Sequence, residues 1–374
     1  MKICSLCVMD ETVPNITFSD VGVCQYCTIS DKIKNLTKKN ISSITHIKDK
    51  IINSSKNSKY NCIAGVSGGR DSTFLLYVLK KKLNLNPLAV HYDNGWNTEL
   101  SNNNIKNVCE KLDIDLYTEV ANWKSFSVVQ NNLIKACVPD VETITELGIY
   151  KTLFEAAKKF KCKYITTGHN IDNEFLDPLF WTYFDGRYIK SICKKYDCLK
   201  ELKNLKIFYL TDLISYQLIN GIKIENVTNL FDYNHGTISE VLTKECGWEP
   251  YKGHHQESNI TKFVNEYYLP KKFKIDKRKT NLSARIRSGL IKRNKAIEIL
   301  KSSSYQNFDK STIDFVLKKL NISEREFEEI LLKENKNFTH FENYYFYFKL
   351  FSPVIKILGE LNLINPYLYY KYNM

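Results

Sequence analysis

The organising segment of this chain reads Asn61-Cys62-Ile63-Ala64-Gly65-Val66-Ser67-Gly68-Gly69-Arg70-Asp71-Ser72. A short apolar run rich in β-forming residues ends at Val66, and a glycine-containing turn follows at once. From residue 73 to residue 83, apolar side chains recur with the spacing of one helix face. The pattern predicts a buried strand, a tight turn and a helix that begins on the turn.

The turn has the properties of a phosphate-binding loop. Successive backbone N–H groups and the positive end of a helix dipole point at one place, which favours an anion. Gly68 and Gly69 let the backbone approach that anion closely. We expect Ser67 and Ser72 to add hydrogen bonds and Asp71 to hold Mg²⁺ against the phosphates. A purely structural glycine turn is the alternative, and the Walker pattern is absent.

The string Ser-Gly-Gly-Arg-Asp-Ser after a strand resembles the pyrophosphate loop of the ATP pyrophosphatase superfamily. Members of that superfamily cleave ATP between the α and β phosphates and adenylate an oxygen of their substrate. The resemblance implies ATP and Mg²⁺ as cofactors. It also implies that the nucleotide is bound by Ser67, Gly68, Gly69, Arg70, Asp71 and Ser72.

Composition limits the class of protein. With 374 residues, 43% of them hydrophobic, the chain can bury one large core and a smaller unit. No apolar run approaches the ~18 residues of a membrane span, and no signal region is present at the start, so we expect a cytoplasmic protein with no membrane insertion. The net charge of +13 predicts an anionic partner, such as a nucleic acid, a nucleotide-linked sugar or a membrane surface.

Four of the eleven cysteines form two Cys-x-x-Cys pairs near the start of the chain: Cys4, Cys7, Cys24 and Cys27. Four thiolates with this spacing are typical of a tetrahedral structural zinc site. A segment of this size cannot build its own hydrophobic core, so a metal would stabilise it. An iron–sulfur cluster also takes four thiolates, and coincidental thiols are a third interpretation.

Strand and helix patterns alternate from residue 60 onward. We predict strands ending at residue 66 and at residues 88–92, 114–120, 164–167 and 207–210, with helices at 73–83, 103–112 and 149–160. Such alternation predicts a doubly wound parallel sheet covered by helices on both faces. Ligands of such sheets bind beyond the carboxyl ends of the strands.

Two further segments follow predicted strands and should meet the phosphate loop. Asp93 lies in the string Asp93-Asn94-Gly95, and Gly168-His169 follows the fourth strand. We expect Asp93, Gly168 and His169 to contact the nucleotide. Both strings are also good turn formers, and that alternative stays open.

The last third of the chain is mainly helical and strongly basic. Six of the nine residues from 271 to 279 are Lys or Arg, interrupted by Phe273 and Ile275. This pattern predicts a segment packed on one side and presented to an anion on the other, although a solvated charged face is the plainer interpretation. His254, His255 and Glu257 match no metal site by their spacing. We expect the aromatic tail at residues 338–374 to pack on the domain or on a second subunit.

Taken together, the motifs resemble the N-acetyl sugar amidotransferase family of ATP-dependent enzymes that make acetamidino sugars. The resemblance rests on the two cysteine pairs, the pyrophosphate loop, and the strings Val138-Pro139-Asp140, Gly247-Trp248, His255-x-Glu257-Ser258, Leu269-Pro270-Lys271-Lys272-Phe273 and Ile275-Asp276-Lys277-Arg278-Lys279. It implies an adenine nucleotide α-hydrolase-like fold. It also implies conversion of an acetamido group of a nucleotide-linked sugar through an O-adenylated imidate, in O-antigen, capsule or nonulosonate biosynthesis. The implied catalytic residues are Ser67, Asp71, Lys272 and Arg278.

We accordingly divide the chain into four parts. These are a zinc ribbon at residues 1–30, a linker with one helix at 31–58, the pyrophosphate-loop ATP-binding α/β domain at 59–245, and a mainly helical substrate and partner region at 246–374.

The nitrogen source is expected to be external. A glutaminase needs an activated cysteine in a G-x-C-x-G elbow or at the mature N-terminus. None of the eleven cysteines stands in such an elbow. The family resemblance implies that ammonia comes from a separate glutaminase subunit, with a barrel-type companion subunit.

Two other functions stay open. A tRNA-modifying pyrophosphate-loop enzyme, of the thiolation or lysidine type, fits the basic charge, the cysteine pairs and Gly168-His169-Asn170. Sulfur insertion usually needs a catalytic Cys-x-x-Cys pair in the core, and Cys193 and Cys198 are spaced differently, so we consider nucleic acid an unlikely partner. A nucleotide-binding scaffold without catalysis is the third interpretation.

Overall fold

The computed structural model describes residues 2–40, 44–231, 234–251, 256–302, 308–361, 363–364 and 367–373. Its centre is a parallel sheet of five strands in the order β3-β2-β1-β4-β5. The strands are β1 (Cys62–Gly65), β2 (Pro87–Asp93), β3 (Leu116–Val120), β4 (Tyr164–Thr166) and β5 (Lys223–Glu225). The predicted α/β fold with a parallel sheet is confirmed.

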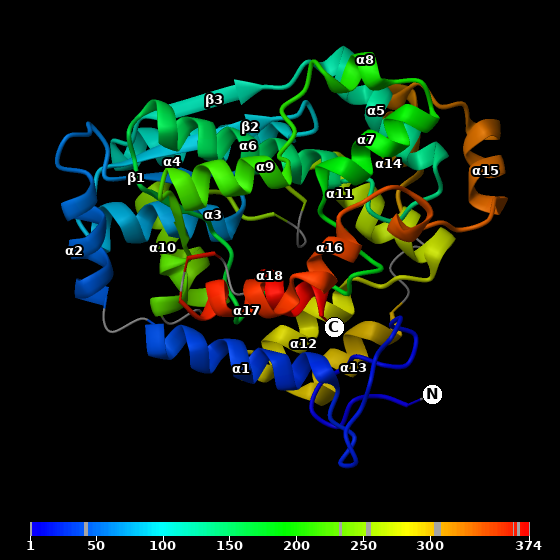
Figure 1. Cartoon of the computed structure of the whole chain (residues 1–374), viewed down its shortest axis with the longest axis horizontal. Coiled ribbons are helices and arrows are strands. Elements are labelled where there is room, and N and C mark those ends of the chain that lie inside the picture. The colour runs from blue at the N-terminus through cyan, green and yellow to red at the C-terminus, as the bar shows by residue number, and fades with distance from the viewer. Residues whose placement is uncertain are drawn as a thin grey trace.

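Helices cover both faces of this sheet (Figure 1). One layer consists of α3 (Arg70–Tyr77), its π-helical continuation η1 (Val78–Lys82), α4 (Glu99–Leu112) and α10 (His235–Cys246), packed in a cluster with Cys62 and Ala64 of β1. The other consists of α5 (Trp123–Lys135) and α6 (Thr143–Lys159), packed in a cluster with Ile63. Because successive side chains of a strand point to opposite faces, β1 is buried on both sides and reads as one apolar run.

The remaining helices cap the domain and build the C-terminal region. They are α1 (Gln25–Asn40), α2 (Ile44–Ser54), α7 (Gly186–Lys195), α8 (Leu199–Leu202), α9 (Leu210–Leu213), η2 (Ile214–Ile219), η3 (Val227–Leu230), α11 (Asn259–Phe263), η4 (Val264–Phe273), α12 (Arg278–Arg287), α13 (Arg293–Lys301), α14 (Lys310–Leu320), α15 (Glu324–Leu332), η5 (Phe338–His340), α16 (Tyr345–Leu350), α17 (Ser352–Glu360) and α18 (Tyr367–Tyr372). None of the described helices is both long and apolar enough to span a bilayer.

The strand predicted at residues 207–210 is wrong. Ile207 and Phe208 are buried core residues outside any strand, and a short helix, α9, starts at Leu210. The Asp212 carboxylate accepts a hydrogen bond from the backbone N–H of Tyr209 at 2.9 Å, which caps that helix. The fifth strand is instead Lys223–Glu225, whose single apolar residue gives almost no periodic signal.

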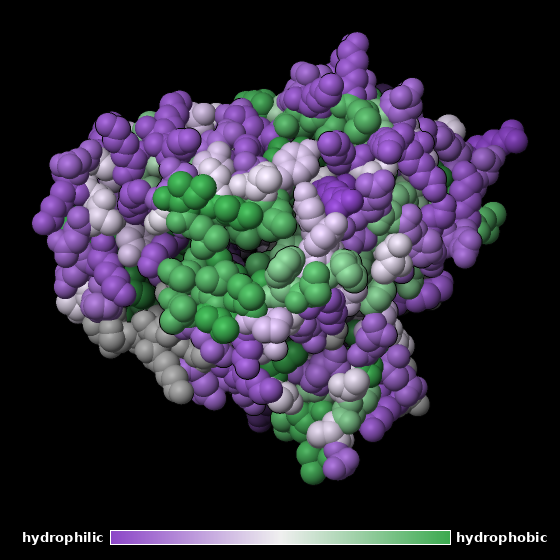
Figure 2. Space-filling view, viewed as in Figure 1, coloured by the Kyte–Doolittle hydropathy of each residue, from purple (hydrophilic) through white to green (hydrophobic). Residues whose placement is uncertain are grey.

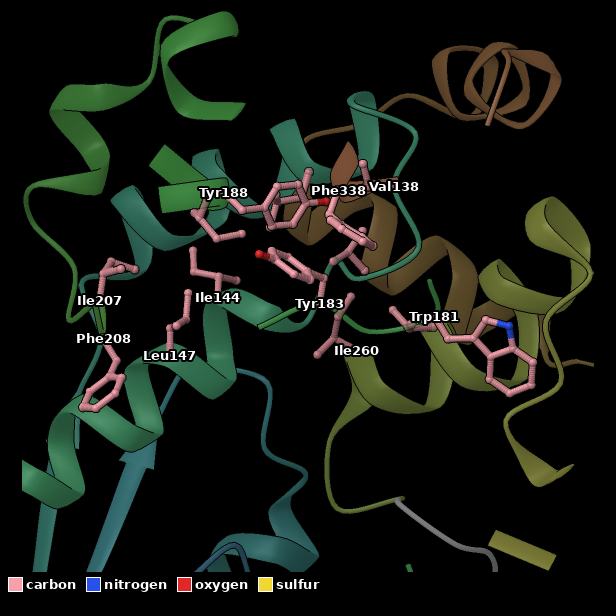
Figure 3. Packing of buried hydrophobic residues seen from close by; sticks show 14 of the residues in the cluster. Val138, Ile144, Leu147, Trp181, Tyr183, Tyr188, Ile207, Phe208, Ile260 and Phe338 are labelled. Carbon is pink, nitrogen blue, oxygen red and sulfur yellow. The ribbon is translucent and has the colours of Figure 1, made fainter. Parts of the chain in front are cut away.

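Aromatic residues join the C-terminal tail to the sheet domain (Figure 3). The ring of Phe338 stacks on that of Tyr183 with centroids 4.1 Å apart, and Tyr372 stacks on Phe348 at 4.2 Å. The Tyr372 hydroxyl donates to the carbonyl of Phe184 at 2.8 Å. The tail therefore packs on the domain, as predicted.

The opposite side of the tail stays exposed. Ile357 on α17 is 56% exposed and Ile219 on η2 is 76% exposed. Figure 2 shows these two elements forming the largest apolar area on the viewed face. The aromatic and aliphatic residues of the tail thus pack into the core on one side of the tail and are exposed on the other.

We predict that Phe338→Ala lowers the free energy of unfolding by about 3–5 kcal/mol, because the ring is buried and stacked and its removal leaves a cavity. Chemical denaturation measures this loss. Leu332→Ala is the control, since that side chain is 88% exposed and its loss should change stability by less than about 0.5 kcal/mol. Equal effects of the two substitutions would contradict the assigned packing.

Candidate active site

Two loops meet where the strand order reverses. The sheet runs from β1 toward β2 on one side and toward β4 on the other, so the segments that follow β1 and β4 leave neighbouring strands at this point. Gly168, just beyond β4, packs against the first turn of α3. A Cβ on Gly168 would lie 2.6 Å from the backbone nitrogen of Ser72, a contact that only glycine allows.

The pyrophosphate loop is held by its own hydroxyl groups. Ser72 Oγ donates to the Gly69 carbonyl at 3.1 Å and accepts from the backbone N–H of Ser67 at 3.2 Å. Gly68 has a φ of +77°, and a Cβ there would lie 2.5 Å from the carbonyl oxygen of Ser101. The loop therefore needs glycine at this position for both backbone conformation and space.

The C-terminal region braces the same loop from outside. The carbonyl oxygen of Gly68 accepts hydrogen bonds from Trp248 Nε1 and from the Tyr251 hydroxyl, both at 3.0 Å. Asn104 Nδ2 donates to the carbonyl of Glu249 at 2.9 Å and fixes this segment on α4. Gly68 is thus a structural member of the loop, because its carbonyl is bonded to Trp248 and Tyr251, which themselves line the cavity.

Asp71 is positioned by two neighbours. Its Oδ1 accepts from Arg70 Nε at 3.2 Å, and its Oδ2 accepts from Asn173 Nδ2 at 2.9 Å. The carboxylate therefore sits in one orientation at the start of α3. A carboxylate beside a phosphate loop is the kind of oxygen ligand that Mg²⁺ takes.

These segments line a cavity of about 590 Å³, a size in the usual range for nucleotide and small-molecule sites. Its apolar wall comes from β2 and α6 and its polar wall from the two loops. Of the residues predicted to contact the nucleotide, the cavity is lined by Ser67, Gly69, Arg70, Asp71, Ser72, Gly168 and His169. His169 Nδ1 lies 3.5 Å from a carboxylate oxygen of Glu174, another lining residue.

Asp93 takes the alternative role, that of a turn former. Its Oδ1 accepts from the backbone N–H of Gly95 at 2.8 Å, and it is not among the lining residues, although both its neighbours Tyr92 and Asn94 are. The carboxylate is engaged in the turn that follows β2.

The sequence analysis missed His91, which lies inside β2 and lines the cavity. Its Nδ1 is 2.9 Å from the Val66 carbonyl oxygen and its Nε2 is 2.7 Å from Asn97 Nδ2. A neutral ring that donates from Nδ1 and accepts at Nε2 satisfies both contacts. Burial lowers the pKa of His91, which keeps the ring neutral at physiological pH.

The C-terminal region supplies further lining residues, among them Glu257, Ser258 and Arg285. The backbone N–H of Thr98 donates to the Glu257 carbonyl at 3.0 Å, so this segment pairs with the chain beyond β2. The family motif His255-x-Glu257-Ser258 could have indicated that Glu257 and Ser258 lie at the site. His254 and His255 lie outside the described residues.

Lys272 and Arg278, which the sequence predicts to be catalytic, are not among the residues that line the cavity. Lys272 is 6% exposed, and its ammonium donates to the carbonyls of Ile330 and Lys333 at the end of α15. Arg278 forms a bidentate pair with Asp276 and donates to the Ser302 carbonyl. Long cationic side chains commonly satisfy helix C-termini in this way.

The other basic residues of the 271–279 segment also bond to protein groups. Lys277 pairs with Asp177 at 2.9 Å and Lys279 with Asp10 at 2.7 Å. The ammonium of Lys271 donates to the Tyr267 hydroxyl, and that of Lys274 to the Lys271 carbonyl. The segment therefore does not present the anion-binding face predicted from its charge.

The four predicted metal ligands form one buried cluster. The sulfur atoms of Cys4, Cys7, Cys24 and Cys27 all lie within 4.8 Å of one another. Three of the sulfur–sulfur distances are 3.7, 3.8 and 3.9 Å. A tetrahedron with metal–sulfur bonds of ~2.3 Å has an edge of ~3.8 Å, so the thiols fit a single ion. The thiolates of a four-iron cluster bind separate iron atoms and stand farther apart.

Comparison with known proteins gives two family matches. Residues 37–205 match the PP-loop domain family, and residues 257–354 match the C-terminal domain of the LPS biosynthesis protein WbpG-like family. Both matched regions supply residues to the cavity.

Curated relatives match part of the chain. An uncharacterized protein of Methanocaldococcus jannaschii is 29% identical over 172 residues, which cover 45% of this chain and 59% of that protein. The tRNA(Ile)-lysidine synthase of Borreliella afzelii is 26% identical over 151 residues, covering 38% of this chain and 32% of the synthase. The matched region thus spans less than two thirds of either relative.

Two solved structures are also similar. The U34-tRNA thiolase NcsA from Methanococcus maripaludis with its [4Fe-4S] cluster is 15% identical, with 90% of each chain covered and a TM-score of 0.30. NMN synthetase from Francisella tularensis is 12% identical, with 79% of this chain and 100% of that chain covered and a TM-score of 0.30. Scores this low transfer no property to this chain.

We predict that Gly168→Ala weakens ATP binding by about five- to a hundredfold, because the new Cβ displaces the start of α3 at a cost typical of overpacking. Equilibrium binding of ATP measures the effect. Gly236→Ala is the control, since a Cβ there meets nothing closer than Asn234 Oδ1 at 3.6 Å. Unchanged ATP affinity in Gly168→Ala would show that the nucleotide does not use this contact.

Proposed function

Because the chain belongs to the PP-loop superfamily and carries a WbpG-like C-terminal domain, we propose that it is an ATP-dependent N-acetyl sugar amidotransferase. In the proposed reaction the acetamido oxygen of a nucleotide-linked sugar attacks the α-phosphorus of ATP. Pyrophosphate leaves and an O-adenylated imidate forms. Ammonia then adds to the imidate carbon, AMP departs with the oxygen, and an acetamidino group remains.

One observation carries this proposal. The pyrophosphate loop and the region matched to WbpG-like proteins line the same cavity, with Ser67 and Asp71 from the first and Glu257, Thr261 and Arg285 from the second. A domain named for lipopolysaccharide biosynthesis therefore completes the nucleotide site itself. This arrangement favours a sugar substrate that reacts at the same place as ATP.

The residues of the loop have distinct tasks in this reaction. The backbone N–H groups in the first turn of α3 and the dipole of this helix stabilise the leaving pyrophosphate. Asp71, held by Arg70 and Asn173, offers a fixed oxygen ligand to Mg²⁺. When bound, Mg²⁺ neutralises charge that develops on the phosphates. Ser67 and Ser72 keep the loop in its phosphate-binding conformation.

We propose further that the four-cysteine cluster holds one Zn²⁺ with a structural role. The cluster is fully buried and its sulfur spacing fits one tetrahedral ion. Four protein thiolates leave no open position for a substrate. The ion stabilises a segment that has little core of its own.

We propose that the nitrogen is delivered as ammonia by a partner glutaminase, with a barrel-type companion subunit. The support is the sequence, in which no cysteine has the context of a glutaminase nucleophile. Every cysteine of this chain is also buried, which denies glutamine access to a thiol.

Modification of tRNA is the second candidate, favoured by the similarity to tRNA(Ile)-lysidine synthases and by the charge of +13. The contacts within residues 271–279 weigh against it, because these basic side chains bond to the protein itself. Tight tRNA binding that falls steeply as salt rises would favour this candidate over the first.

The decisive test incubates the protein with ATP, Mg²⁺, an ammonium salt and nucleotide-linked acetamido sugars. We expect AMP and pyrophosphate as products, and a sugar in which oxygen is replaced by NH on mass spectrometry. Glutamine should replace ammonium only when a glutaminase partner is added. Release of ADP would overturn the proposal.

In that assay Asp71→Asn should lower the rate by about a hundredfold or more, because a charged ligand for the metal–phosphate unit is lost. The matched control is Asp113→Asn, a fully exposed residue with a φ of 51° that asparagine tolerates well. We expect this control to keep full activity. Equal rates for the two variants would remove Asp71 from the reaction.

Elemental analysis should find about one zinc per chain. Cys24→Ser should lose the metal and lower the melting temperature, because three thiolates bind the ion more weakly and the ribbon loses its support. Cys109→Ala is the control, as this buried cysteine of α4 lies outside the cluster. Iron and sulfide in place of zinc would overturn the zinc assignment.

A further inference from the structure

We infer that Arg285 binds the phosphate chain of ATP in the cavity and that the cysteine ribbon, residues 2–30, holds it there through α12. The inference depends on ATP binding at the pyrophosphate loop and not on the proposed amidotransferase activity.

The charges around the cavity motivate the assignment. Among the described lining residues, the guanidinium groups are those of Arg70 and Arg285, and the carboxylates are those of Asp71, Glu174 and Glu257. Arg70 donates to Asp71 beside it. A polyphosphate needs cationic donors, and the planar guanidinium fork suits phosphate oxygens. Arg285 is the cation that the C-terminal region brings to this site.

The first turn of α12 is fixed by ion pairs to distant segments. Lys277, which precedes the helix, pairs with Asp177 beyond β4 at 2.9 Å. Lys279 pairs with Asp10 of the ribbon at 2.7 Å and also donates to Thr12 Oγ1 at 2.9 Å. The basic segment predicted to bind an anion thus orients the helix that carries Arg285.

The rest of α12 is held by the ribbon and by the segment beyond β4. The backbone N–H of Val8 donates to Ser283 Oγ at 3.3 Å, and Val8 packs on Leu282. At the end of the helix, Ser288 Oγ donates to Asp172 Oδ1 at 2.7 Å. Figure 1 shows α12 and α13 lying between the N-terminal ribbon and the domain. The helix therefore has little freedom to rotate.

Arg285 and Arg287 point in opposite directions from this helix, since two residues correspond to about 200° of rotation. Arg287 lies over the ring of Phe175 at 4.9 Å and within 3.9 Å of Cys27 Sγ. Arg293 of α13 donates to the carbonyls of Cys4 and Cys7, both at 3.0 Å. One face of α12 thus contacts the cysteine cluster while the other delivers Arg285 to the cavity.

A diphosphate also occurs in nucleotide-linked sugars, so the experiment separates the two sources. Binding of pyrophosphate, ATP, adenosine and UDP-N-acetylglucosamine is measured with Mg²⁺ for the full chain and for Arg285→Gln. We expect pyrophosphate and ATP affinities to fall by about 10- to 100-fold, the loss typical of a charge-assisted hydrogen bond. Adenosine affinity should stay within about twofold, since it carries no phosphate.

Two matched variants accompany this measurement. Arg285→Lys should recover part of the pyrophosphate affinity, because it keeps the charge and loses only the fork. Arg325→Gln removes the same charge from an arginine whose side chain is 92% exposed, and should change nothing. An equal loss of adenosine and pyrophosphate binding in both Arg285 variants would mean a structural role and overturn the assignment. Weaker binding of the UDP-sugar alone would also overturn it.

The role of the ribbon is tested by Asp10→Asn, which removes the charge opposite Lys279. We expect this variant to weaken pyrophosphate binding by about threefold or more in the natural background and to have no effect in Arg285→Gln. Such non-additivity shows that the ribbon acts through Arg285. Equal effects of Asp10→Asn in both backgrounds, or no effect in either, would overturn this connection.

Discussion

The nucleotide cavity depends on one close contact, between the carboxyl end of β4 and the first turn of α3. Gly168 meets the backbone of Asp71 and Ser72 at a distance that excludes any Cβ. Because backbone lies against backbone there, the segment with His169 and the pyrophosphate loop line the same cavity. The cavity lies where the strand order reverses between β1 and β4, at the carboxyl end of the sheet.

Residues of the C-terminal region, which lie outside the sheet, form another part of the cavity wall. Trp248 and Tyr251 fix the loop by its Gly68 carbonyl, and α12 contributes Arg285. The ion pairs around α12 are partly buried, and such pairs add little net stability after desolvation. Their effect is on position, since they hold the helix in one orientation between the ribbon and the cavity.

Much of the fold was predictable because its signals are local. A strand, a glycine turn and a helix follow one another within residues 61–83, and the four cysteines stand in two short pairs. The apolar runs of β1, β2 and β4 likewise reflect burial on both faces of a parallel sheet. Apolar sequence runs failed to predict strands at two places. Residues 207–208 are apolar because they pack in the core outside any strand, whereas β5 is a strand with only one apolar residue.

The sequence by itself determined the parallel α/β architecture, the glycine loop after β1 and the set of four cysteines that cluster, since each depends on residues close together in the chain. Only the tertiary structure decided which charged side chains reach the cavity. Lys272 and Arg278 bond to helix carbonyls and to Asp276, whereas His91 and Arg285 line the site without any distinctive motif. A side chain's partner depends on which distant segments pack beside it, and a long lysine or arginine reaches protein or ligand oxygens with equal ease.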